Sequence, residues 1–319
     1  IKTVFTIHNI AYQGKYGLDI LEDTCGIGAR DAHVVEYDGC ANFMKGAIET
    51  ADKVTTVSPT YAQEILDPWF SHGLDGLLRQ KQYKTCGILN GIDVDVFNPA
   101  TDPDIAKNYD VDTFQEGKAV CKAALQDEMG LHKDGSPVMA MVTRLVGHKG
   151  VDLVRAIAEG LLQQGIELVI LGSGEAQYEN FFNELCARNP GRVGVYIGFN
   201  AKLAQHIYAG ADMFLMPSRS EPCGLAQMVS CRYGTIPIVR ETGGLRDSIR
   251  DSGDGFGNGF TFANYNAHEL YEACWRAKEG YWQKDGWPIL VRRAMECDFS
   301  WSNSAKSYEG LYNEVVNLW

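Results

Sequence analysis

The sequence predicts an α/β protein with two doubly wound, Rossmann-like lobes, and three features support this prediction. Runs of strand-forming residues such as Val4-Phe5-Thr6-Ile7 are typical of strands buried on both faces of a parallel sheet. From residue 138 onward, such runs alternate regularly with helix-length segments, the pattern of a parallel sheet covered by helices. Turn residues gather at Asn98-Pro99 and Asp102-Pro103, where we expect the two lobes to separate.

The first half of the chain predicts the end of one lobe. We expect, in order, a strand at residues 4–7, a helix at about 40–51, a strand at 54–58, a helix that opens at Pro59 and a strand at 86–89. A chain that begins within a buried strand begins inside a domain. We therefore expect an N-terminally truncated fragment with an incomplete first lobe.

The second half predicts a complete doubly wound lobe and a helical end. The expected strands lie at residues 138–144, 166–171, 193–199, 212–216 and 236–240, with helices between them at about 150–163, 176–187, 201–209 and 224–233. Three further helices are expected at about 267–279, 288–297 and 303–317.

Composition excludes several kinds of partner. The 41 acidic residues outnumber the 29 Lys and Arg, and a net charge of −12 would repel a nucleic acid backbone. No stretch approaches the roughly 20 apolar residues of a membrane-spanning helix, and no signal peptide opens the chain. The nine cysteines form no C-x-x-C pair, which favours reduced thiols in a cytosol-like compartment. We expect a cytoplasmic protein with neither a nucleic acid nor a membrane partner.

A phosphate-bearing substrate would need a local site, because the acidic surface offers no general positive field. Ligands of open α/β sheets bind beyond the carboxyl ends of the strands, so the residues directly after each strand are the candidates. Strand 138–144 ends in Arg144, and Lys149 stands at the mouth of the next helix, whose free N–H groups favour an anion. One loop thus supplies two cations and a helix N-terminus.

Three more strand ends carry candidate residues, namely Glu221, the glycine loop Thr242-Gly243-Gly244, and His8. Each has an ordinary structural interpretation, as a helix-capping acid, a tight turn or a structural histidine, and Arg144 with Lys149 could be a solvated surface pair. Their joint placement at strand ends favours a shared function.

Several segments together resemble the bacterial glycogen synthases and plant starch synthases. They are TIHNIAYQG (6–14), LNGIDVDVFNP (89–99), TRLVGHKG (143–150), PSRSEPCGLAQM (217–228) and RETGGLRDS (240–248). The resemblance covers essentially the whole chain and implies the GT-B architecture, with two Rossmann-like lobes and a cleft between them. It implies that residues 1–100 end the acceptor-side lobe, 101–135 connect the lobes, 136–285 form the nucleotide-sugar lobe, and the helices of 286–319 cross back to the first lobe.

The resemblance also implies roles for single residues. Arg144 and Lys149 would hold the donor diphosphate, together with the backbone of Thr242, Gly243 and Gly244. Glu221 would lie near the donor sugar, which the main chain of Cys223, Gly224 and Leu225 would contact. His8 would lie close to the reacting carbon, Asn90 would face the cleft, and Phe199 would stack on the nucleotide base.

The implied reaction is retaining transfer of glucose from ADP-glucose to the non-reducing end of an α-1,4-glucan, in the cytoplasm or, in a plant, in the plastid stroma. No metal or cofactor is expected, because two cations can neutralise the leaving diphosphate. The chain departs from the family pattern in three places. It has no Lys-x-Gly-Gly loop before His8, it has Val229 where related families carry a second glutamate, and it has Gly147-His148 in the cation loop, where His148 is expected to be incidental.

Alternative functions make different predictions. The chain could be another GT-B nucleotide-sugar transferase, or a catalytically inactive glucan-binding fragment. Gly172-Ser-Gly174 suggests a nicotinamide dehydrogenase, but Gln177 stands where the third glycine is needed. The triplets Asp93-Val-Asp95 and Asp110-Val-Asp112 suggest a metal site, but neither follows a convincing strand end.

Overall fold

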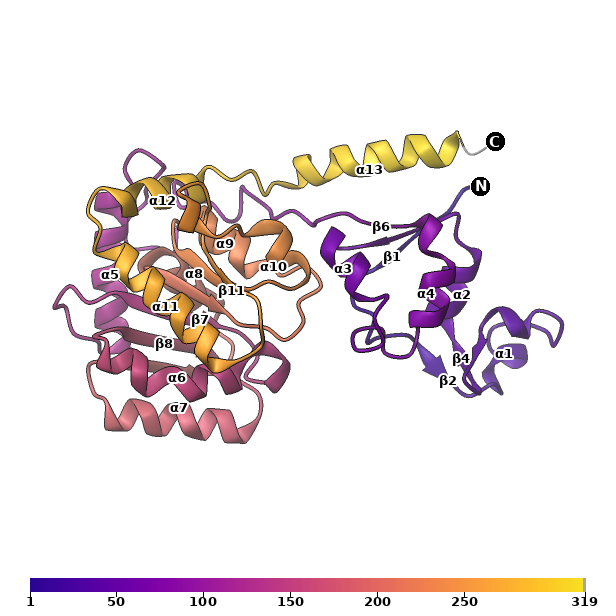
Figure 1. The fold of residues 1–319 in the computed structure, drawn as a ribbon, viewed down its shortest axis with the longest axis horizontal. Coiled ribbons are helices and arrows are strands. Elements are labelled where there is room, and N and C mark those ends of the chain that lie inside the picture. Colours follow the sequence, from indigo (N-terminus) through magenta and orange to yellow (C-terminus); the bar gives the residue numbers. More distant parts are fainter. Residues whose placement is uncertain (318–319) are drawn as a thin grey trace. The chain divides into compact units, whose positions relative to one another are not determined.

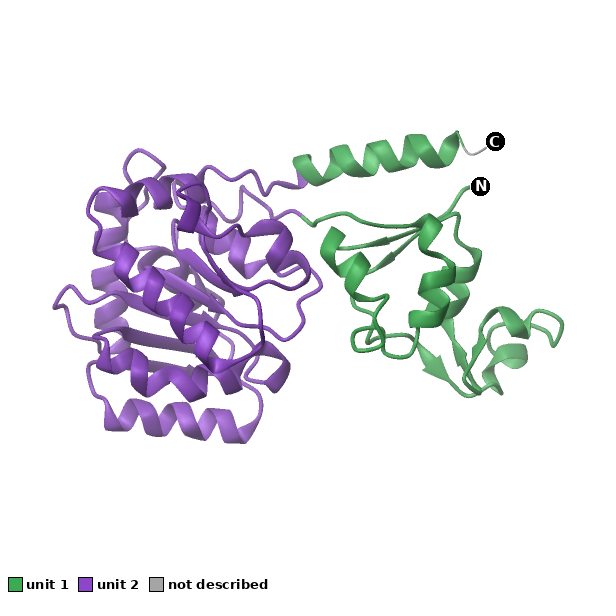
Figure 2. Ribbon diagram, in the orientation of Figure 1, with its two compact units in different colours: residues 1–90, 302–319 green, residues 91–301 purple. Residues whose placement is uncertain are grey.

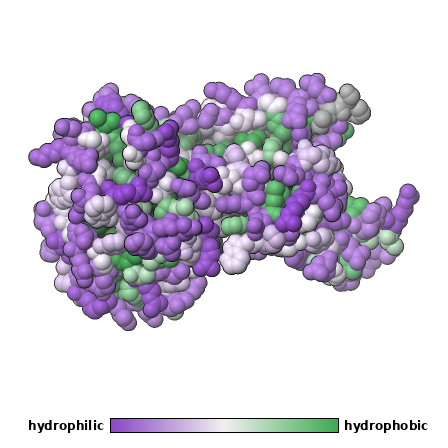
Figure 3. Space-filling view, in the orientation of Figure 1, coloured by the Kyte–Doolittle hydropathy of each residue, from purple (hydrophilic) through white to green (hydrophobic). Residues whose placement is uncertain are grey.

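The computed structural model describes residues 1–317 and divides into two compact units (Figures 1 and 2). One unit contains residues 1–90 and the chain from Ser302 onward, and the other contains residues 91–301. The sequence predicts an interlobe connection at residues 101–135. In the structure this stretch contains helix α5 (Phe114–Met129), which belongs to the second unit. The face in Figure 3 is largely hydrophilic, with hydrophobic residues in small patches.

The second unit is built on a six-stranded sheet in the order β12-β11-β10-β7-β8-β9, and every neighbouring pair is parallel. Its strands are β7 (Val138–Val142), β8 (Glu167–Gly172), β9 (Val193–Ile197), β10 (Met213–Met216), β11 (Ile236–Arg240) and β12 (Phe260–Phe262). All residues of β8 are buried, as expected for a central strand covered on both faces. The predicted doubly wound α/β fold is confirmed.

Helices alternate with these strands. They are α5, α6 (Val151–Gln163), α7 (Ala176–Arg188), α8 (Ala201–Gly210), α9 (Ala226–Arg232), α10 (Gly243–Ser248), α11 (Ala267–Tyr281) and α12 (Gly286–Met295). Local sequence fixes several ends: the side chains of Asn200 and Asn266 accept hydrogen bonds from Leu203 N and Glu269 N and so begin α8 and α11. Gly130, with φ of 67°, ends α5.

The first unit contains a parallel sheet in the order β1-β5-β6 and an antiparallel sheet in the order β2-β4-β3. Its strands are β1 (Val4–Ile7), β2 (Lys15–Tyr16), β3 (Glu36–Tyr37), β4 (Cys40–Asn42), β5 (Lys53–Thr56) and β6 (Thr85–Gly87). Its helices are α1 (Ile20–Asp23), α2 (Phe43–Thr50), α3 (Pro59–Glu64), α4 (Asp75–Gln80) and, from Ser302, α13 (Trp301–Val316). Leu311 and Val315 of α13 pack on Ile88, and Ser304 Oγ donates to Leu89 O at 2.6 Å.

Several predicted boundaries differ from the structure, and three of the differences have a local cause. The helix expected at 40–51 begins at Phe43, because residues 40–42 pair as β4 and the Asn42 side chain caps the helix. The strand expected at 138–144 ends at Val142, which leaves Arg144 in the following loop. The strand expected at 193–199 ends at Ile197, because Gly198 adopts a φ of 146°.

None of the helices among residues 1–317 combines the length and the apolar character that crossing a bilayer requires.

A partly buried lysine joins α5 to the sheet of the second unit. Lys118 Nζ donates to the carbonyl oxygens of Ala209 (3.0 Å), Ala211 (3.0 Å) and Tyr233 (3.2 Å) and to Thr235 Oγ1 (2.9 Å). Burial lowers the pKa of Lys118 to about 8, because desolvation disfavours the ammonium form.

Replacing Lys118 with Met is expected to lower the free energy of unfolding by about 3 kcal/mol, because several buried acceptors lose their donor. Urea unfolding at pH 7 measures the effect. Lys133→Met, at a lysine whose side chain is 47% exposed, is the matched control and should change stability little. Equal stability of the two variants would contradict a structural role for Lys118.

Candidate active site

Three loops meet at one edge of the second unit's sheet. β11, β10 and β7 are adjacent parallel strands, so the loops that follow them leave the sheet at the same edge. These are residues 143–150, 217–225 and 241–242, the last leading into α10. The loop after β10 therefore lies between the other two.

Backbone contacts hold the three loops together. Arg219 N donates to His148 O at 2.9 Å, and Gly244 N donates to Glu221 O at 3.1 Å. Close packing requires glycine at two positions with positive φ: a Cβ would lie 2.1 Å from Pro217 O at Gly150, and 1.9 Å from Glu221 O at Gly243. The glycines thus let the outer loops approach the central loop.

A short ion pair lies where the loops after β7 and β10 meet. Lys149 Nζ lies 2.6 Å from Glu221 Oε2, and the two side chains are 19% and 10% exposed. Ser218 Oγ donates to the same carboxylate oxygen at 3.0 Å. Two positioning contacts on one oxygen fix the direction of the Glu221 carboxylate and keep a cation beside it.

Arg144 lies on the wall of a neighbouring pocket that also contains Phe199. The pocket has a volume of about 330 Å³, and its lining includes Gly172 and Ser173 at the end of β8. The Phe199 side chain is 92% exposed, so one ring face is open to a ligand. The pocket thus combines a guanidinium with an aromatic ring, two groups that suit a nucleotide.

His148, which the sequence predicts to be incidental to the reaction, lies beside Arg144. Its Nε2 lies 3.5 Å from Arg144 Nη2. Burial, then the charges of Lys149 and Arg144, lower the pKa of His148. A neutral imidazole can accept a hydrogen bond, and His148 lies within reach of the Arg144 guanidinium.

The remaining predicted residues of the second unit border the same loops. Thr242, Gly243 and Cys223 are buried, while Leu225 is exposed. Gly224 has a φ of 69°, which reverses the chain just before α9. The structure thus brings together Arg144, Lys149, Phe199, Glu221, Cys223–Leu225 and Thr242–Gly244 in one unit. His8, exposed directly after β1, and Asn90 belong to the other unit.

Gly172 and Gly174, the glycines that suggest a dehydrogenase, have a packing role. A Cβ at Gly172 would lie 1.8 Å from Thr143 O, and one at Gly174 would lie 2.3 Å from Leu145 O. Leu145 N also donates to Ser173 O at 2.8 Å. These glycines let the loop after β8 pack against residues 143–150, the loop after β7 that carries Arg144 and Lys149.

The aspartate triplets cap turns. Asp93 Oδ1 accepts hydrogen bonds from the N–H groups of Asp95 and Val96, and Asp110 Oδ1 accepts from those of Asp112 and Thr113. Within residues 1–317 no group of three His, Cys, Asp or Glu side chains has the arrangement of a metal site.

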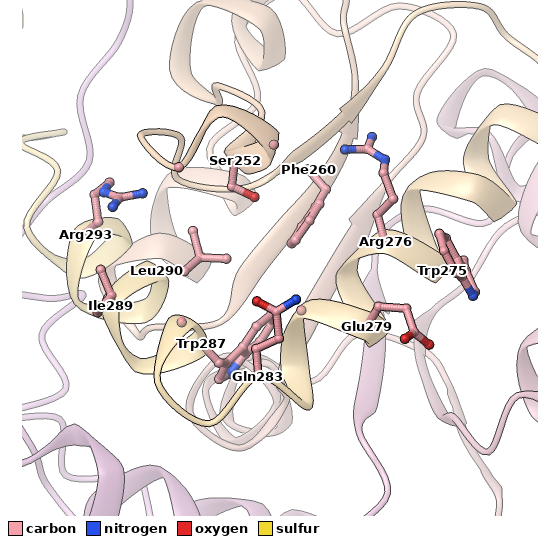
Figure 4. A pocket seen from close by; sticks show the side chains of 14 residues that line it. Ser252, Phe260, Trp275, Arg276, Glu279, Gln283, Trp287, Ile289, Leu290 and Arg293 are labelled. Atoms are coloured by element: carbon pink, nitrogen blue, oxygen red, sulfur yellow. The ribbon is translucent and has the colours of Figure 1, made fainter.

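A second cavity of about 480 Å³ lies between β12, α11 and α12 (Figure 4). Phe260, Leu290 and Trp287 contribute apolar surface, and Gln283 contributes an amide. Its lining contains none of the residues that the sequence predicts for the site.

Comparison with known proteins defines the class. Residues 1–80 match the family described as starch synthase catalytic domain, and residues 125–281 match the family described as glycosyl transferases group 1. The catalytic domain of starch synthase IV from Arabidopsis thaliana, solved with ADP and acarbose, superposes with a TM-score of 0.90 at 36% identity, over 99% of this chain and 67% of that one. The chain thus has the two-lobed GT-B fold of glycosyltransferases.

Curated relatives define the family more closely. The glycogen synthase of Geobacillus thermodenitrificans (strain NG80-2) is 47% identical over 99% of this chain and 66% of its own length, and that of Bacillus cereus (strain ATCC 10987 / NRS 248) is 47% identical over 99% and 67%. The chain therefore belongs to the glycogen synthase and starch synthase family of hexosyltransferases. It spans about two thirds of the length of these relatives.

Proposed function

We propose that this protein transfers glucose from ADP-glucose to the non-reducing end of an α-1,4-glucan with retention of configuration. The observation that carries the proposal is the pairing of Lys149 with Glu221 at the strand ends, beside a pocket that Arg144 shares with Phe199. The starch synthase relative with bound ADP and acarbose, a nucleotide and an oligosaccharide, supports a nucleotide-sugar donor and a glucan acceptor.

In the proposed reaction the bond between the sugar C1 and the diphosphate breaks, and a bond from C1 to the acceptor 4-oxygen forms on the same face. The diphosphate leaves with the bonding electron pair, and the acceptor hydroxyl gives its proton to an oxygen of the leaving diphosphate. Arg144 and Lys149 are proposed to bind the diphosphate and to stabilise the charge that grows on it. The backbone of Thr242, Gly243 and Gly244 is proposed to contact the same phosphates.

The sugar is proposed to lie against the loop after β10. Glu221 is held by Lys149 and Ser218, which supports a fixed carboxylate near the donor glucose. The main chain of Cys223, Gly224 and Leu225 is proposed to contact the sugar hydroxyls. His8 and Asn90, from the first unit, are proposed to serve the reacting carbon and the acceptor side.

The exposed ring of Phe199 is proposed to stack on the nucleotide base. Replacing Phe199 with Ala should raise the donor KM roughly tenfold with little change in kcat, because stacking is worth about 1–1.5 kcal/mol and acts equally on substrate and transition state. Steady-state kinetics with varied donor measure this. Tyr196→Ala, at an exposed aromatic residue of β9, is the control. An effect confined to glucan affinity would remove Phe199 from the base site.

A cytoplasmic or plastid-stromal location is part of the proposal. All nine cysteines lie within the described residues and are free thiols, which supports a reducing compartment.

A donor comparison with glycogen primer tests the proposed function. We expect incorporation of glucose from ADP-glucose to exceed that from UDP-glucose. Transfer of a different sugar would favour another GT-B transferase. Binding of glycogen without binding of any nucleotide sugar would favour an inactive glucan-binding protein and would overturn the proposal.

A further inference from the structure

Gln227 is a fully buried amide behind Cys223–Leu225, the segment proposed to contact the sugar, and the resemblance implies no role for it. It lies in the first turn of α9. Its Nε2 donates to Cys223 O at 3.1 Å and Gly224 O at 2.9 Å, and it contacts Ser248 Oγ at 3.0 Å. One side chain therefore holds two successive carbonyl groups of the loop that follows β10.

Holding these carbonyls determines where the next N–H groups point. In a trans peptide the C=O and the following N–H point in opposite directions. With the carbonyls of Cys223 and Gly224 drawn toward Gln227, the N–H groups of Gly224 and Leu225 point away from it. In the described part of the chain neither N–H group has a protein acceptor, so both can donate to a ligand.

A second contact connects Gln227 to Thr242–Gly244, the loop proposed to contact the phosphates. Ser248, the last residue of α10, donates through Oγ to Gly244 O at 2.6 Å while it accepts from Gln227. Gln227 and Ser248 thus form a relay that joins Cys223 and Gly224 to Gly244.

Gly224 and Gln227 also fit each other sterically. A Cβ at residue 224 would lie 2.6 Å from Gln227 Oε1, and the φ of 69° independently favours glycine. The Gln227 amide therefore packs against the turn at Gly224 and also donates a hydrogen bond to it. Both contacts restrict the conformation of this turn.

We infer that Gln227 is a positioning residue that directs the N–H groups of Gly224 and Leu225 toward the donor sugar. Through Ser248 it also fixes the position of this backbone relative to Thr242–Gly244, the loop proposed to contact the phosphates. This inference rests on the proposed function, because it takes the donor to be a nucleotide sugar. Gln227 acts through the backbone and does not itself contact the ligand.

The test is the affinity of the purified chain for ADP-glucose and for ADP, measured by calorimetry with Gln227→Met. Methionine keeps the length of the side chain and removes the donor. We expect the Kd for ADP-glucose to rise about tenfold, and that for ADP less than threefold, because the N–H groups that Gln227 positions bind the glucose and not the nucleotide. Ser248→Ala should raise both values together, because it acts on the loop at Thr242–Gly244.

Gln126→Met is the matched control. Gln126 is also buried and donates through Nε2 to a backbone carbonyl, His132 O, and to Glu167 Oε2, but it lies in α5, and Glu167 is at the amino end of β8. Its loss should lower stability without changing the ratio of the two Kd values. An unchanged Kd for ADP-glucose in Gln227→Met, or equal weakening of ADP and ADP-glucose, would overturn the inference. Failure of the unaltered chain to bind ADP-glucose would instead count against the proposed function.

Discussion

Replacing Lys149 with Ala is expected to lower the rate of glucosyl transfer by about 10²–10³-fold, and Arg144→Ala should have a similar effect. Each change removes a cation that we propose stabilises charge developing on the leaving diphosphate, and such groups are worth roughly 3–4 kcal/mol in a water-poor site. The loss should appear mainly in kcat, because the charge grows as the bond breaks.

The two cations should differ in their effect on stability. Lys149 is the partner of the buried Glu221, so Lys149→Ala leaves a buried carboxylate without its cation, whereas Arg144 is exposed. We expect Lys149→Ala to lower the unfolding temperature more than Arg144→Ala. Lys133→Ala, which removes an exposed lysine of the same unit, is the control for both. If either folded variant keeps near-normal turnover, the residue that it replaces does not stabilise the leaving diphosphate.

Glu221→Gln is expected to lower turnover by about 10²-fold while the fold is retained. The substitution preserves shape and the contact with Ser218 but removes the negative charge that pairs with Lys149. A positively charged sugar in the transition state would lose a nearby carboxylate, and Lys149 would lose the group that orients it. Steady-state kinetics and circular dichroism measure the two effects.

Glu167→Gln provides the matched comparison. Glu167 is likewise buried in the second unit, but it stands at the amino end of β8, and burial raises the pKa of its carboxyl group. A neutral amide is therefore well tolerated there, and turnover should stay unchanged. If Glu221→Gln and Glu167→Gln behave alike, Glu221 has no part in the reaction.

The strands and most helices of the second unit could be predicted because their signals are local. Ile236–Arg240 and Val151–Gln163 have their predicted length and type within a residue, since a buried run or a helix-length segment lies between clear breakers. α5 was not predicted as a helix, because its charged sequence lies in a stretch that resembles a connection. Short strands such as β4 depend on pairing with distant residues, which no local pattern shows.

The site could be predicted in its residue types but not in its contacts. The sequence places Lys149 and Glu221 after separate strands. It does not show that they pair, because they lie 72 positions apart in the chain. Gln227 resembles any polar residue of a short helix, and only its burial reveals a role. His148 departs from the family pattern, so the resemblance gave no hint of its contact with Arg144.

The Lys149–Glu221 pair is better explained by function than by stability. Two charges that are mostly removed from water lose hydration, and their attraction often only balances that loss. In the proposed reaction a diphosphate provides Lys149 with a second anionic partner, so the pair keeps a cation ready at the strand ends.

A crystal structure of the chain with bound ADP tests the central claim most directly. The account predicts diphosphate oxygens within about 3 Å of both Arg144 and Lys149, at the distance of charge-assisted hydrogen bonds, with the base against Phe199. A diphosphate bound elsewhere on the second unit, with both cations turned away from it, would contradict the account.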